Sequence, residues 1–295
     1  QNKPDWDVMM FETIGIAGLG LVGGSVALAV KSKGIAHKIF GYTRTSQTLQ
    51  KATERGIIDR GFSDFDEFIK DAEFVILSAP ISANIGFARR IAKQHPYLLF
   101  TDVGSTKTDI VRAVEESFPS GHRFAGSHPM AGSEKKGIDQ ASGSLFENKA
   151  VIITPLPNCA CSTTETIEKF WQMIGGKPIR MDAKTHDEIC TYTSHLPHLI
   201  AFLLVSLLSE KMDEPYVNFC VGAGFRDTTR IAASDHEIWS EIFLSNRKNM
   251  LHAIKKLRLY LDQVEKMIDK KDGRLLKEWI EKIRKIRSAI CDDMQ

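Results

Sequence analysis

The sequence predicts an α/β protein in which an N-terminal doubly wound, mainly parallel sheet is followed by an all-helical C-terminal domain. In the first part of the chain, short apolar runs alternate with helix-like segments, as expected when parallel strands are joined by helices that cover both faces of a sheet. Beyond about residue 181, glycine and proline become sparse, and residues 187–211 and 236–291 are predicted to form long helices. The 295 residues suffice for two domains, which we expect at residues 1–180 and 181–295.

The strands are expected where apolar runs end in polar or turn-forming residues. In chain order these runs cover residues 13–17, 38–42, 74–77, 98–102, 124–126 and 151–154. Ligands of doubly wound sheets bind beyond the carboxyl ends of the strands. Ser78, Asp102 and His128 lie at or just after predicted strand ends, so we expect them to face one crevice. Ser78, Pro80 and Asp102 are therefore candidate cofactor-binding residues.

A glycine-rich segment joins the first strand to the first helix. It reads Gly18-Leu19-Gly20-Leu21-Val22-Gly23, which has the glycine spacing of a dinucleotide-binding turn. Gly18 would allow a tight turn, Gly20 would let the backbone approach a pyrophosphate, and Gly23 would let the helix lie close to the sheet. The free N–H groups of the first helical turn would then bind phosphate. All six residues predict a Rossmann-like cofactor site; the alternative is a turn that only packs the helix on the sheet.

The three residues that directly follow the second strand indicate which dinucleotide is bound. Enzymes that use NAD usually place Asp or Glu there, about 20 residues beyond the last glycine, to bind the ribose hydroxyls. This chain has Thr43, Arg44 and Thr45 instead. Arg44 can pair with a 2′-phosphate, and no carboxylate is present to repel it. We therefore expect NADP to be favoured over NAD, unless Arg44 is an ordinary solvated loop residue.

One histidine stands in a run that contains both proline and glycine, Ser127-His-Pro-Met-Ala-Gly-Ser-Glu134. This composition predicts a loop downstream of the dinucleotide segment. Removal of hydride from a carbon that bears a hydroxyl requires a base for the hydroxyl proton. Neutral imidazole suits that role because its ordinary pKa of about 6.5 lies near working pH. His128 is the candidate for that base.

Composition and charge argue against several other classes of protein. The formal net charge is +2, and no basic stripe with interleaved aromatic residues is present, so nucleic acid is not expected as a partner. The longest apolar run, near residues 199–208, is too short to span a bilayer, and we expect neither a signal peptide nor a membrane partner. The five cysteines are odd in number and lack zinc-like spacing, which indicates reduced thiols in a cytoplasmic protein.

Five motifs, in order, resemble those of the prephenate/arogenate (cyclohexadienyl) dehydrogenase family. They are the glycine segment extended to Ser25, residues 102–105 (Asp-Val-Gly-Ser), residues 127–134, residues 194–198 (Ser-His-Leu-Pro-His) and residues 224–232 (Gly-Phe-Arg-Asp-Thr-Thr-Arg-Ile-Ala). The resemblance covers nearly the whole chain. It implies oxidative decarboxylation of a small-molecule substrate, prephenate or arogenate, in tyrosine biosynthesis, with NADP or NAD as cofactor. It also implies a helical domain through which two copies form a homodimer.

The same resemblance implies roles for further residues. Ser105 would hydrogen-bond the substrate hydroxyl and hold His128 in line. Arg230 would bind a substrate carboxylate, and Asp227, three residues earlier, could orient its guanidinium.

His195 and His198 lie three residues apart near the start of an apolar helix, so they project to similar sides. The resemblance implies that both contact the side-chain end of the substrate. We expect no metal there, because no third ligand is nearby; a buried structural histidine is the stronger alternative for His195. Glu134 is either an ion-pair partner at the pocket mouth or a surface carboxylate, and Trp239 is expected in the core or an interface.

Two other functions stay open on the sequence alone. A β-hydroxyacid dehydrogenase has the same order of domains, but it needs a catalytic lysine, and no motif around Lys211 or Lys248 indicates one. A non-catalytic NADP-binding sensor would bind the cofactor without turnover, which fits poorly with a histidine, a serine and an arginine suited to one substrate. Prephenate and arogenate differ only in a keto or an amino group, and that choice stays open as well.

Overall fold

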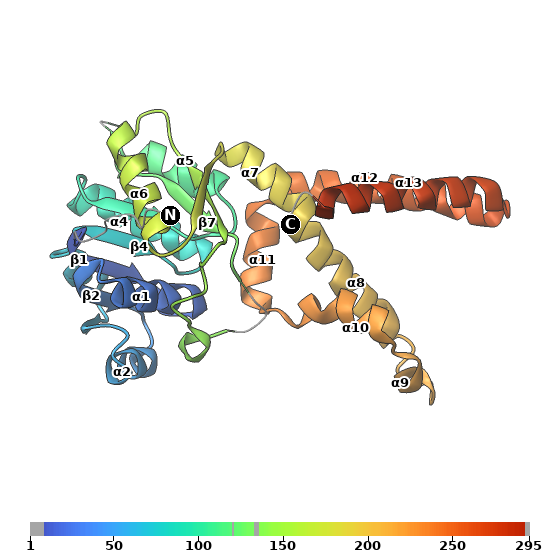
Figure 1. Cartoon of the computed structure of the whole chain (residues 1–295), viewed down its shortest axis with the longest axis horizontal. Helices are drawn as coiled ribbons and strands as arrows, with labels where there is room; N and C mark the ends of the chain where they lie inside the picture. Colours follow the sequence, from blue (N-terminus) through green and yellow to red (C-terminus); the bar gives the residue numbers. More distant parts are fainter. Residues whose placement is uncertain (1–8, 120, 133–135, 293–295) are drawn as a thin grey trace. The chain divides into compact units, whose positions relative to one another are not determined.

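The computed structural model describes residues 9–119, 121–132 and 136–292, and its first part is built on a six-stranded sheet (Figure 1). The strand order is β3-β2-β1-β4-β5-β6, and every neighbouring pair is parallel. The strands are β1 (Phe11–Ala17), β2 (Ala36–Tyr42), β3 (Arg60–Phe62), β4 (Phe74–Leu77), β5 (Leu99–Asp102) and β6 (Arg123–Phe124). The direction of winding reverses between β1 and β4, and dinucleotides bind at such a switch point.

Helices cover both faces of this sheet and bury two apolar clusters against it. One cluster joins the strands to α1 (Leu21–Lys33), α2 (Ser46–Glu54) and α6 (Cys161–Met173). The other joins them to α3 (Phe65–Ile69), α4 (Ile81–Gln94) and α5 (Thr108–Ser117). Because parallel strands covered on both faces have no solvent side, β4 is apolar and buried at all of its positions. The predicted α/β fold with a parallel sheet is confirmed.

A second, smaller sheet was not expected from the sequence. It has three strands in the order β7-β8-β9: β7 (Gly126–Pro129), β8 (Ala150–Thr154) and β9 (Lys177–Arg180). β7 pairs with β8 antiparallel, and β8 pairs with β9 parallel. The predicted strand over 124–126 is in fact the junction of two strands, because Phe124 ends β6 in the first sheet while Gly126 begins β7 in the second. His128 therefore lies on a strand, opposite Ile152, and its predicted place in a loop is wrong.

Beyond Arg180, every described element is helical. The helices up to residue 245 are α7 (Ala183–Cys190), α8 (Leu196–Ser209), α9 (Val217–Cys220), α10 (Ala223–Thr229) and α11 (His236–Ser245), with a π turn over Thr191–His195 and a 3-10 turn over Arg230–Ala233. The predicted helix over 236–291 is interrupted twice. Asn246 ends α11 with φ −99° and ψ 25°, and Lys271, in the link before α13, has a positive φ of 53°.

By density of contacts the chain divides into two compact units, residues 1–247 and 248–295. The second unit contains most of α12 (Arg247–Asp269) and all of α13 (Gly273–Asp292). The helices α7 to α11 belong to the same unit as the two sheets, so a cavity can form between them.

One continuous helical run, Ala183–Ser209, is long and apolar enough by composition to cross a membrane. The apolar run of residues 199–208 alone predicted no such segment, but the π turn joins α7 and α8 into one continuous helix. Core helices of soluble proteins meet the same criterion. Only 17% of the apolar window is buried within the chain, so much of its surface is available for contact with another molecule.

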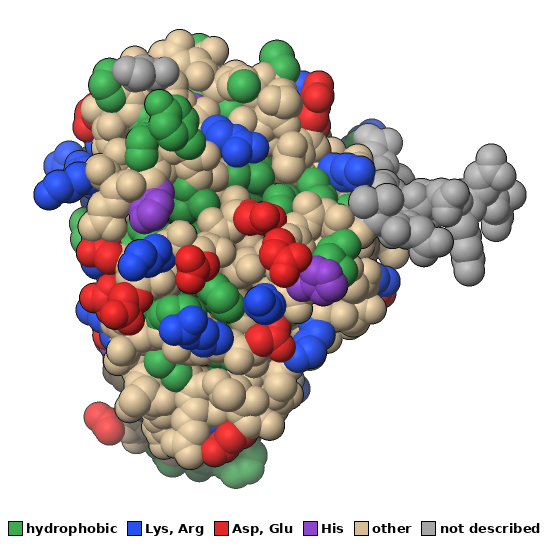
Figure 2. Space-filling view, turned by 90° about the vertical axis from the view of Figure 1, so that its left-hand side faces the viewer, with side chains coloured by type: hydrophobic (Ala, Val, Ile, Leu, Met, Phe, Trp, Pro, Cys, Tyr) green, Lys and Arg blue, Asp and Glu red, His purple; other side chains and the backbone are tan. Residues whose placement is uncertain are grey.

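Charged side chains of both signs are mixed on the face of the molecule seen in Figure 2. Ion pairs of the first unit, such as Lys51–Asp139 at 2.8 Å and Lys31–Asp59 at 3.4 Å, have the same mixed character. Such an arrangement is unlike the continuous basic surface of proteins that bind nucleic acid.

The glycine segment between β1 and α1 allows a direct test of how closely α1 packs on the turn that precedes it. A Cβ on Gly23 would lie 1.9 Å from the carbonyl oxygen of Gly18, a backbone atom that has no room to move. We predict that Gly23→Ala lowers the unfolding free energy by about 1–3 kcal/mol, the usual cost of overpacking.

Gly86→Ala is the matched control, because Gly86 lies inside α4 and a Cβ there meets no atom within 4 Å. This change should leave stability equal or raise it by about 0.5–1 kcal/mol. Urea unfolding of both variants measures the difference. Equal stability of Gly23→Ala and the parent protein would contradict the close packing of α1 on the turn.

Candidate active site

A cavity of about 490 Å³ opens beyond the carboxyl ends of β1, β4 and β5. Residues of the sheet region and residues of the helices contribute to its wall. Those named in the argument below are Gly20, Leu21, Val22, Ser78, Ser105, His128, His198, Arg230 and Trp239. Eight of these residues, all except Trp239, are site residues that the sequence singled out.

The glycine turn has the geometry that its sequence predicts. Gly18 has a positive φ of 104°, and a Cβ there would lie 2.4 Å from the carbonyl oxygen of Ser78. A Cβ on Gly20 would meet no atom within 4 Å, so the backbone borders open space at this point. The residues present therefore fit a dinucleotide pyrophosphate. Leu19 differs from the prediction, because its side chain is buried in the core and only its backbone is available to a ligand.

The other predicted cofactor residues lie in three separate places. Ser78 lines the cavity, and Pro80 is exposed just before α4. Thr43, Arg44 and Thr45 follow β2 outside the cavity wall, where Thr45 immediately precedes α2 and Arg44 is exposed.

Asp102 does not face the crevice, and the expectation for its side chain is wrong. It is 1% exposed and forms a buried ion pair with Nζ of Lys107. Its two oxygens also accept hydrogen bonds from the backbone N–H groups of Gly104 (2.8 Å) and Ser127 (3.4 Å). Asp102 therefore holds the chain beside the cavity instead of contacting a ligand in it.

Ser127 fixes the strand that carries His128. Its hydroxyl accepts the indole N–H of Trp171 at 3.0 Å and lies 2.7 Å from Oγ1 of Thr101. Its carbonyl oxygen accepts a hydrogen bond from Nζ of Lys107 at 2.7 Å. Successive side chains of a strand point to opposite faces. Because Ser127 is anchored in the core, His128 is directed to the cavity side.

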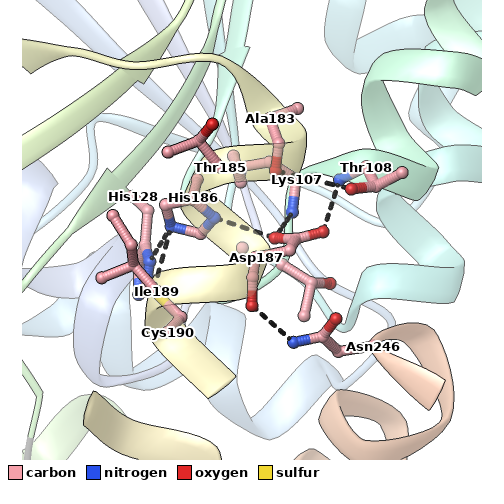
Figure 3. A network of polar contacts seen from close by, with 12 residues as sticks. Lys107, Thr108, His128, Ala183, Thr185, His186, Asp187, Ile189, Cys190 and Asn246 are labelled. Carbon is pink, nitrogen blue, oxygen red and sulfur yellow. Dashed lines mark hydrogen bonds and ion pairs between the residues drawn. The ribbon is translucent and has the colours of Figure 1, made fainter. Parts of the chain in front are cut away.

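His128 belongs to a chain of hydrogen bonds that runs into α7 (Figure 3). Its Nδ1 lies 2.8 Å from Nε2 of His186, and Nδ1 of His186 lies 2.8 Å from Oδ1 of Asp187. Burial, together with the nearby His186, Lys107 and His195, holds the pKa of His128 well below its ordinary value. The imidazole is therefore neutral at pH 7, as a general base must be.

Asp187 is the fixed end of this chain. Burial alone would raise the pKa of its carboxyl, but hydrogen bonds from His186, Thr108 and Lys107 outweigh that effect and keep the pKa below its ordinary value. The backbone N–H groups of Lys107 and Thr108 donate to its two oxygens at 2.8 and 2.9 Å. The carboxylate thus caps the start of α5.

His128, His186 and Cys190 each offer a ligand atom, and these atoms lie within 4.8 Å of one another, close enough to hold a metal ion. The two imidazoles are already hydrogen-bonded to each other. Burial raises the pKa of the Cys190 thiol to about 12, so the thiol keeps its proton at neutral pH. Because the two imidazoles are already paired in this way, we interpret the three groups as a hydrogen-bonded cluster.

His198, Arg230 and Trp239 form a second group on the cavity wall. The imidazole of His198 stacks on the indole of Trp239, with 3.5 Å between ring centroids and 21° between their planes. Nδ1 of His198 lies 2.9 Å from the carbonyl oxygen of Ser194, so Nδ1 is the donor. Trp239 lines the cavity, which differs from the prediction that it serves only the core or an interface.

Two further predicted residues, His195 and Asp227, do not line the cavity. His195 is 1% exposed and its Nδ1 lies 3.0 Å from the amide nitrogen of Asn246, which favours the alternative of a buried structural histidine over a contact with substrate. Asp227 is exposed on α10 and does not line the cavity. Glu134 lies outside the described residues.

Sequence reasoning missed His186, Lys107 and Asp187. None of them stands in a glycine-rich or proline-rich motif, and all three are nearly inaccessible to solvent. A signal was nevertheless present: histidine and aspartate are adjacent at 186–187, and a lysine follows the predicted strand end at Asp102 by five positions. The sequence alone does not show that Lys107 lies next to His186 and Asp187 in the folded protein.

Comparison with known proteins links both halves of the chain to one family. Residues 26–180 match the family model described as prephenate dehydrogenase, nucleotide-binding domain, and residues 182–284 match the one described as prephenate dehydrogenase, dimerization domain. The chain is 32% identical to a prephenate dehydrogenase of Bacillus subtilis over 95% of its own length and 76% of the relative. It is 31% identical to a cyclohexadienyl dehydrogenase of Zymomonas mobilis over 96% of its length and 98% of the relative.

Solved structures agree with these matches. Prephenate dehydrogenase from Aquifex aeolicus, in complex with hydroxyphenyl propionate and NAD⁺, has a TM-score of 0.87 and 33% identity, with 95% of this chain and 98% of the other covered. Arogenate dehydrogenase from Synechocystis has a TM-score of 0.78 and 26% identity, with 94% and 99% covered.

The buried histidines predict how stability depends on pH. Burial lowers the pKa of His195 to about 4, whereas the unfolded chain binds a proton at this residue below about 6.5. We predict that the unfolding free energy falls as the pH drops from 6.5 toward 4, by at most about 1.4 kcal/mol per pH unit for this group.

Urea unfolding between pH 4 and 7.5 measures this effect. His195→Gln should reduce the slope relative to the parent protein, whereas His37→Gln, which replaces an exposed histidine, is the control. Equal slopes in His195→Gln and the parent would show that His195 is not a buried neutral imidazole.

Proposed function

Because the chain belongs to the prephenate dehydrogenase family, we propose that this cavity carries out an NAD(P)-dependent oxidative decarboxylation of prephenate, of arogenate, or of both. The reaction belongs to tyrosine biosynthesis. One observation carries the proposal: the glycine turn, His128 and Arg230 line the same cavity. This combination disfavours the two alternatives, a β-hydroxyacid dehydrogenase with a catalytic lysine and a sensor without a base.

The substrate is a cyclohexadiene with a hydroxyl at C4 and a carboxylate at C1 of its ring. The bound dinucleotide supplies the acceptor for the C4 hydride. His128 takes the hydroxyl proton as the hydride leaves, and the C1 carboxylate departs as CO₂. The electrons of the broken bond complete the aromatic ring, and the C4 oxygen regains the proton from His128. Aromatisation drives these steps, so the main task of the protein is orientation.

The wall residues suit the remaining demands of this substrate. Arg230 supplies a guanidinium for a substrate carboxylate, and hydrogen bonds to charged groups contribute roughly 1.5–3 kcal/mol each. Ser105 lines the same cavity as His128, and its hydroxyl can hydrogen-bond the C4 oxygen. Nδ1 of His198 is engaged by the backbone, which leaves Nε2 for the side-chain end of the substrate.

The preference for NADP is a finer part of the proposal. The loop after β2 has no carboxylate at Thr43, and it offers Arg44 and Thr45 immediately before the N-terminus of α2. A 2′-phosphate would gain the guanidinium and the free N–H groups of the first helical turn. The Aquifex aeolicus relative was solved with NAD⁺, so a relative at 33% identity does bind the other dinucleotide.

We also propose a homodimer formed through the helices that follow residue 180, which we take as the domain boundary. The match to a dimerization domain supports this assembly. Large apolar side chains are exposed on α8, α9 and α11: Leu203 (48%), Leu207 (62%), Phe219 (86%) and Leu244 (71%). Apolar surface of this extent on neighbouring helices is typical of a contact surface.

The family consists of soluble metabolic enzymes, and a cytoplasmic location agrees with the free thiols of the described cysteines.

The activity is tested by incubating the protein with prephenate or arogenate and either dinucleotide, with absorbance of the reduced cofactor as the readout. We predict that His128→Asn lowers kcat by about 10²–10⁴-fold, the usual contribution of a general base, and leaves the Kd for the dinucleotide nearly unchanged. Turnover by the parent protein and unchanged kcat in the variant would remove the base assignment. No turnover with either substrate would refute the proposed function.

A substitution of Arg44 tests the preference for NADP. We predict that Arg44→Ala raises the Kd for NADP by about 10-fold or more, the equivalent of one lost charge-assisted hydrogen bond, and changes the Kd for NAD by less than about twofold. Isothermal titration calorimetry measures both values. Arg55→Ala removes a partly exposed arginine that is paired with Asp139, and it should affect neither. Equal weakening of both dinucleotides by Arg44→Ala would contradict the 2′-phosphate contact.

The dimer is tested by replacing an apolar side chain on α8. Leu207→Lys should dissociate the dimer because an unpaired ammonium in an apolar interface is strongly unfavourable. The molar mass from light scattering should fall from twice 33.0 kDa to that of one chain. The exposed side of the first unit offers the control Lys51→Glu, which should stay dimeric. A monomeric parent protein would contradict the proposed assembly.

A further inference from the structure

We infer that His186 and Asp187 are positioning residues that set the tautomer of His128, so that its Nε2 carries the lone pair offered to the cavity. The inference deepens the proposed function, on which it rests for the role of His128. In water, a histidine side chain prefers its proton on Nε2, which is the wrong form for a base acting through that atom. The hydrogen bonds that link Asp187 to His186 and His186 to His128 reverse this preference.

The direction of the hydrogen bonds is fixed at Asp187. Both carboxylate oxygens accept backbone N–H groups, Oδ1 from Lys107 and Oδ2 from Thr108. An ionised carboxylate has no proton to donate. Nδ1 of His186, 2.8 Å from Oδ1, must therefore carry the proton of that hydrogen bond.

A neutral imidazole has one N–H group, so a proton on Nδ1 leaves Nε2 of His186 as an acceptor. Two groups approach this atom: Nδ1 of His128 at 2.8 Å and Sγ of Cys190 at 3.4 Å. Burial keeps the Cys190 thiol protonated, so its S–H is a donor and needs an acceptor. Both contacts therefore agree with a bare Nε2 on His186.

The proton between the two histidines then belongs to Nδ1 of His128, and Nε2 of His128 is bare. His128 lines the cavity, and because Nδ1 is directed at His186, Nε2 is the nitrogen left to receive the substrate proton. The arrangement is the logic of a Ser-His-Asp triad, in which a carboxylate holds the base in the correct tautomer, extended by one more imidazole.

Charge around His128 acts in the same direction. The groups that face it are His186 and Cys190 from α7, His195 from the π turn and Lys107 from the turn before α5. The cation of Lys107 disfavours a positive charge on the imidazole of His128. The relay, which consists of Asp187, His186 and His128, therefore orients the imidazole of His128 while its Nε2 stays unprotonated.

The test compares two substitutions of His186. The amide oxygen of His186→Gln can accept the Nδ1 proton of His128, whereas His186→Phe keeps a planar aromatic ring, slightly larger than an imidazole, that has no acceptor. We expect His186→Phe to lower kcat by roughly 10- to 10³-fold, within the contribution of the base itself, with little change in KM. His186→Gln should keep kcat within about fivefold of the parent protein, because it restores the acceptor.

The tautomer is observed directly by ¹⁵N NMR of protein labelled at histidine, in which His128→Asn identifies the signals of His128. The parent protein and His186→Gln should show a protonated Nδ1 and a bare Nε2 at pH 7. In His186→Phe the proton should move to Nε2. A protonated Nε2 in the parent protein, or the same tautomer and kcat in parent and His186→Phe, would overturn the inference. The NMR readout needs no turnover, so it stands or fails separately from the proposed reaction.

Cys190→Ala distinguishes the relay from a metal site. The Cys190 side chain contacts Nε2 of His186 from the same helix but is not a member of the relay. Its removal should therefore change kcat by less than about twofold. Dialysis of the parent protein against EDTA should likewise leave kcat unchanged. A loss of activity on EDTA treatment that zinc restores would show that these three side chains bind a metal, and it would overturn the relay.

Discussion

The arrangement of the cleft depends on one buried cation, the ammonium group of Lys107. It pairs with Asp102 at the end of β5 and donates to the carbonyl oxygen of Ser127 on β7, while the backbone N–H of the same residue donates to Asp187 on α7. One residue therefore joins the main sheet, the second sheet and the first helix beyond them. A buried charge that loses its partner costs about 3–5 kcal/mol, so these three elements are held in one arrangement.

That constraint suits His128, a histidine on a strand, to the role of base that we propose for it. A loop would have to be ordered when the substrate binds, whereas β7 is already fixed through Ser127 and the pairing with β8. The helix α7 then supplies His186 and Asp187 from the opposite side. Strand and helix therefore hold His128 on the wall of the cavity that Gly20 and Trp239 also line. Such preorganisation is what a reaction driven by aromatisation requires of its protein.

The fold and the cofactor end could be predicted because their signals are local. Glycine spacing, apolar runs and strand ends are properties of short segments, and Gly18, Gly20 and Gly23 have the environments that this spacing implies. The second sheet could not be predicted in the same way, because β7 and β8 are 20 residues apart and each is short. The different surroundings of His195 and His198 could not be predicted, because i, i+3 spacing does not tell which of two histidines faces the core. Lys107 and His186 were missed because their meaning lies in contacts between distant segments.

The central claim is that one cleft brings the imidazole of His128 to the alcohol whose carbon faces a nicotinamide. A crystal structure of the protein with NADP and hydroxyphenyl propionate tests it most directly. We predict that the ring hydroxyl of the ligand lies about 2.6–3.2 Å from Nε2 of His128, the reach of a general base, and that the dinucleotide pyrophosphate lies at the glycine turn. A ligand hydroxyl bound away from His128, with the imidazole turned toward the core, would contradict it.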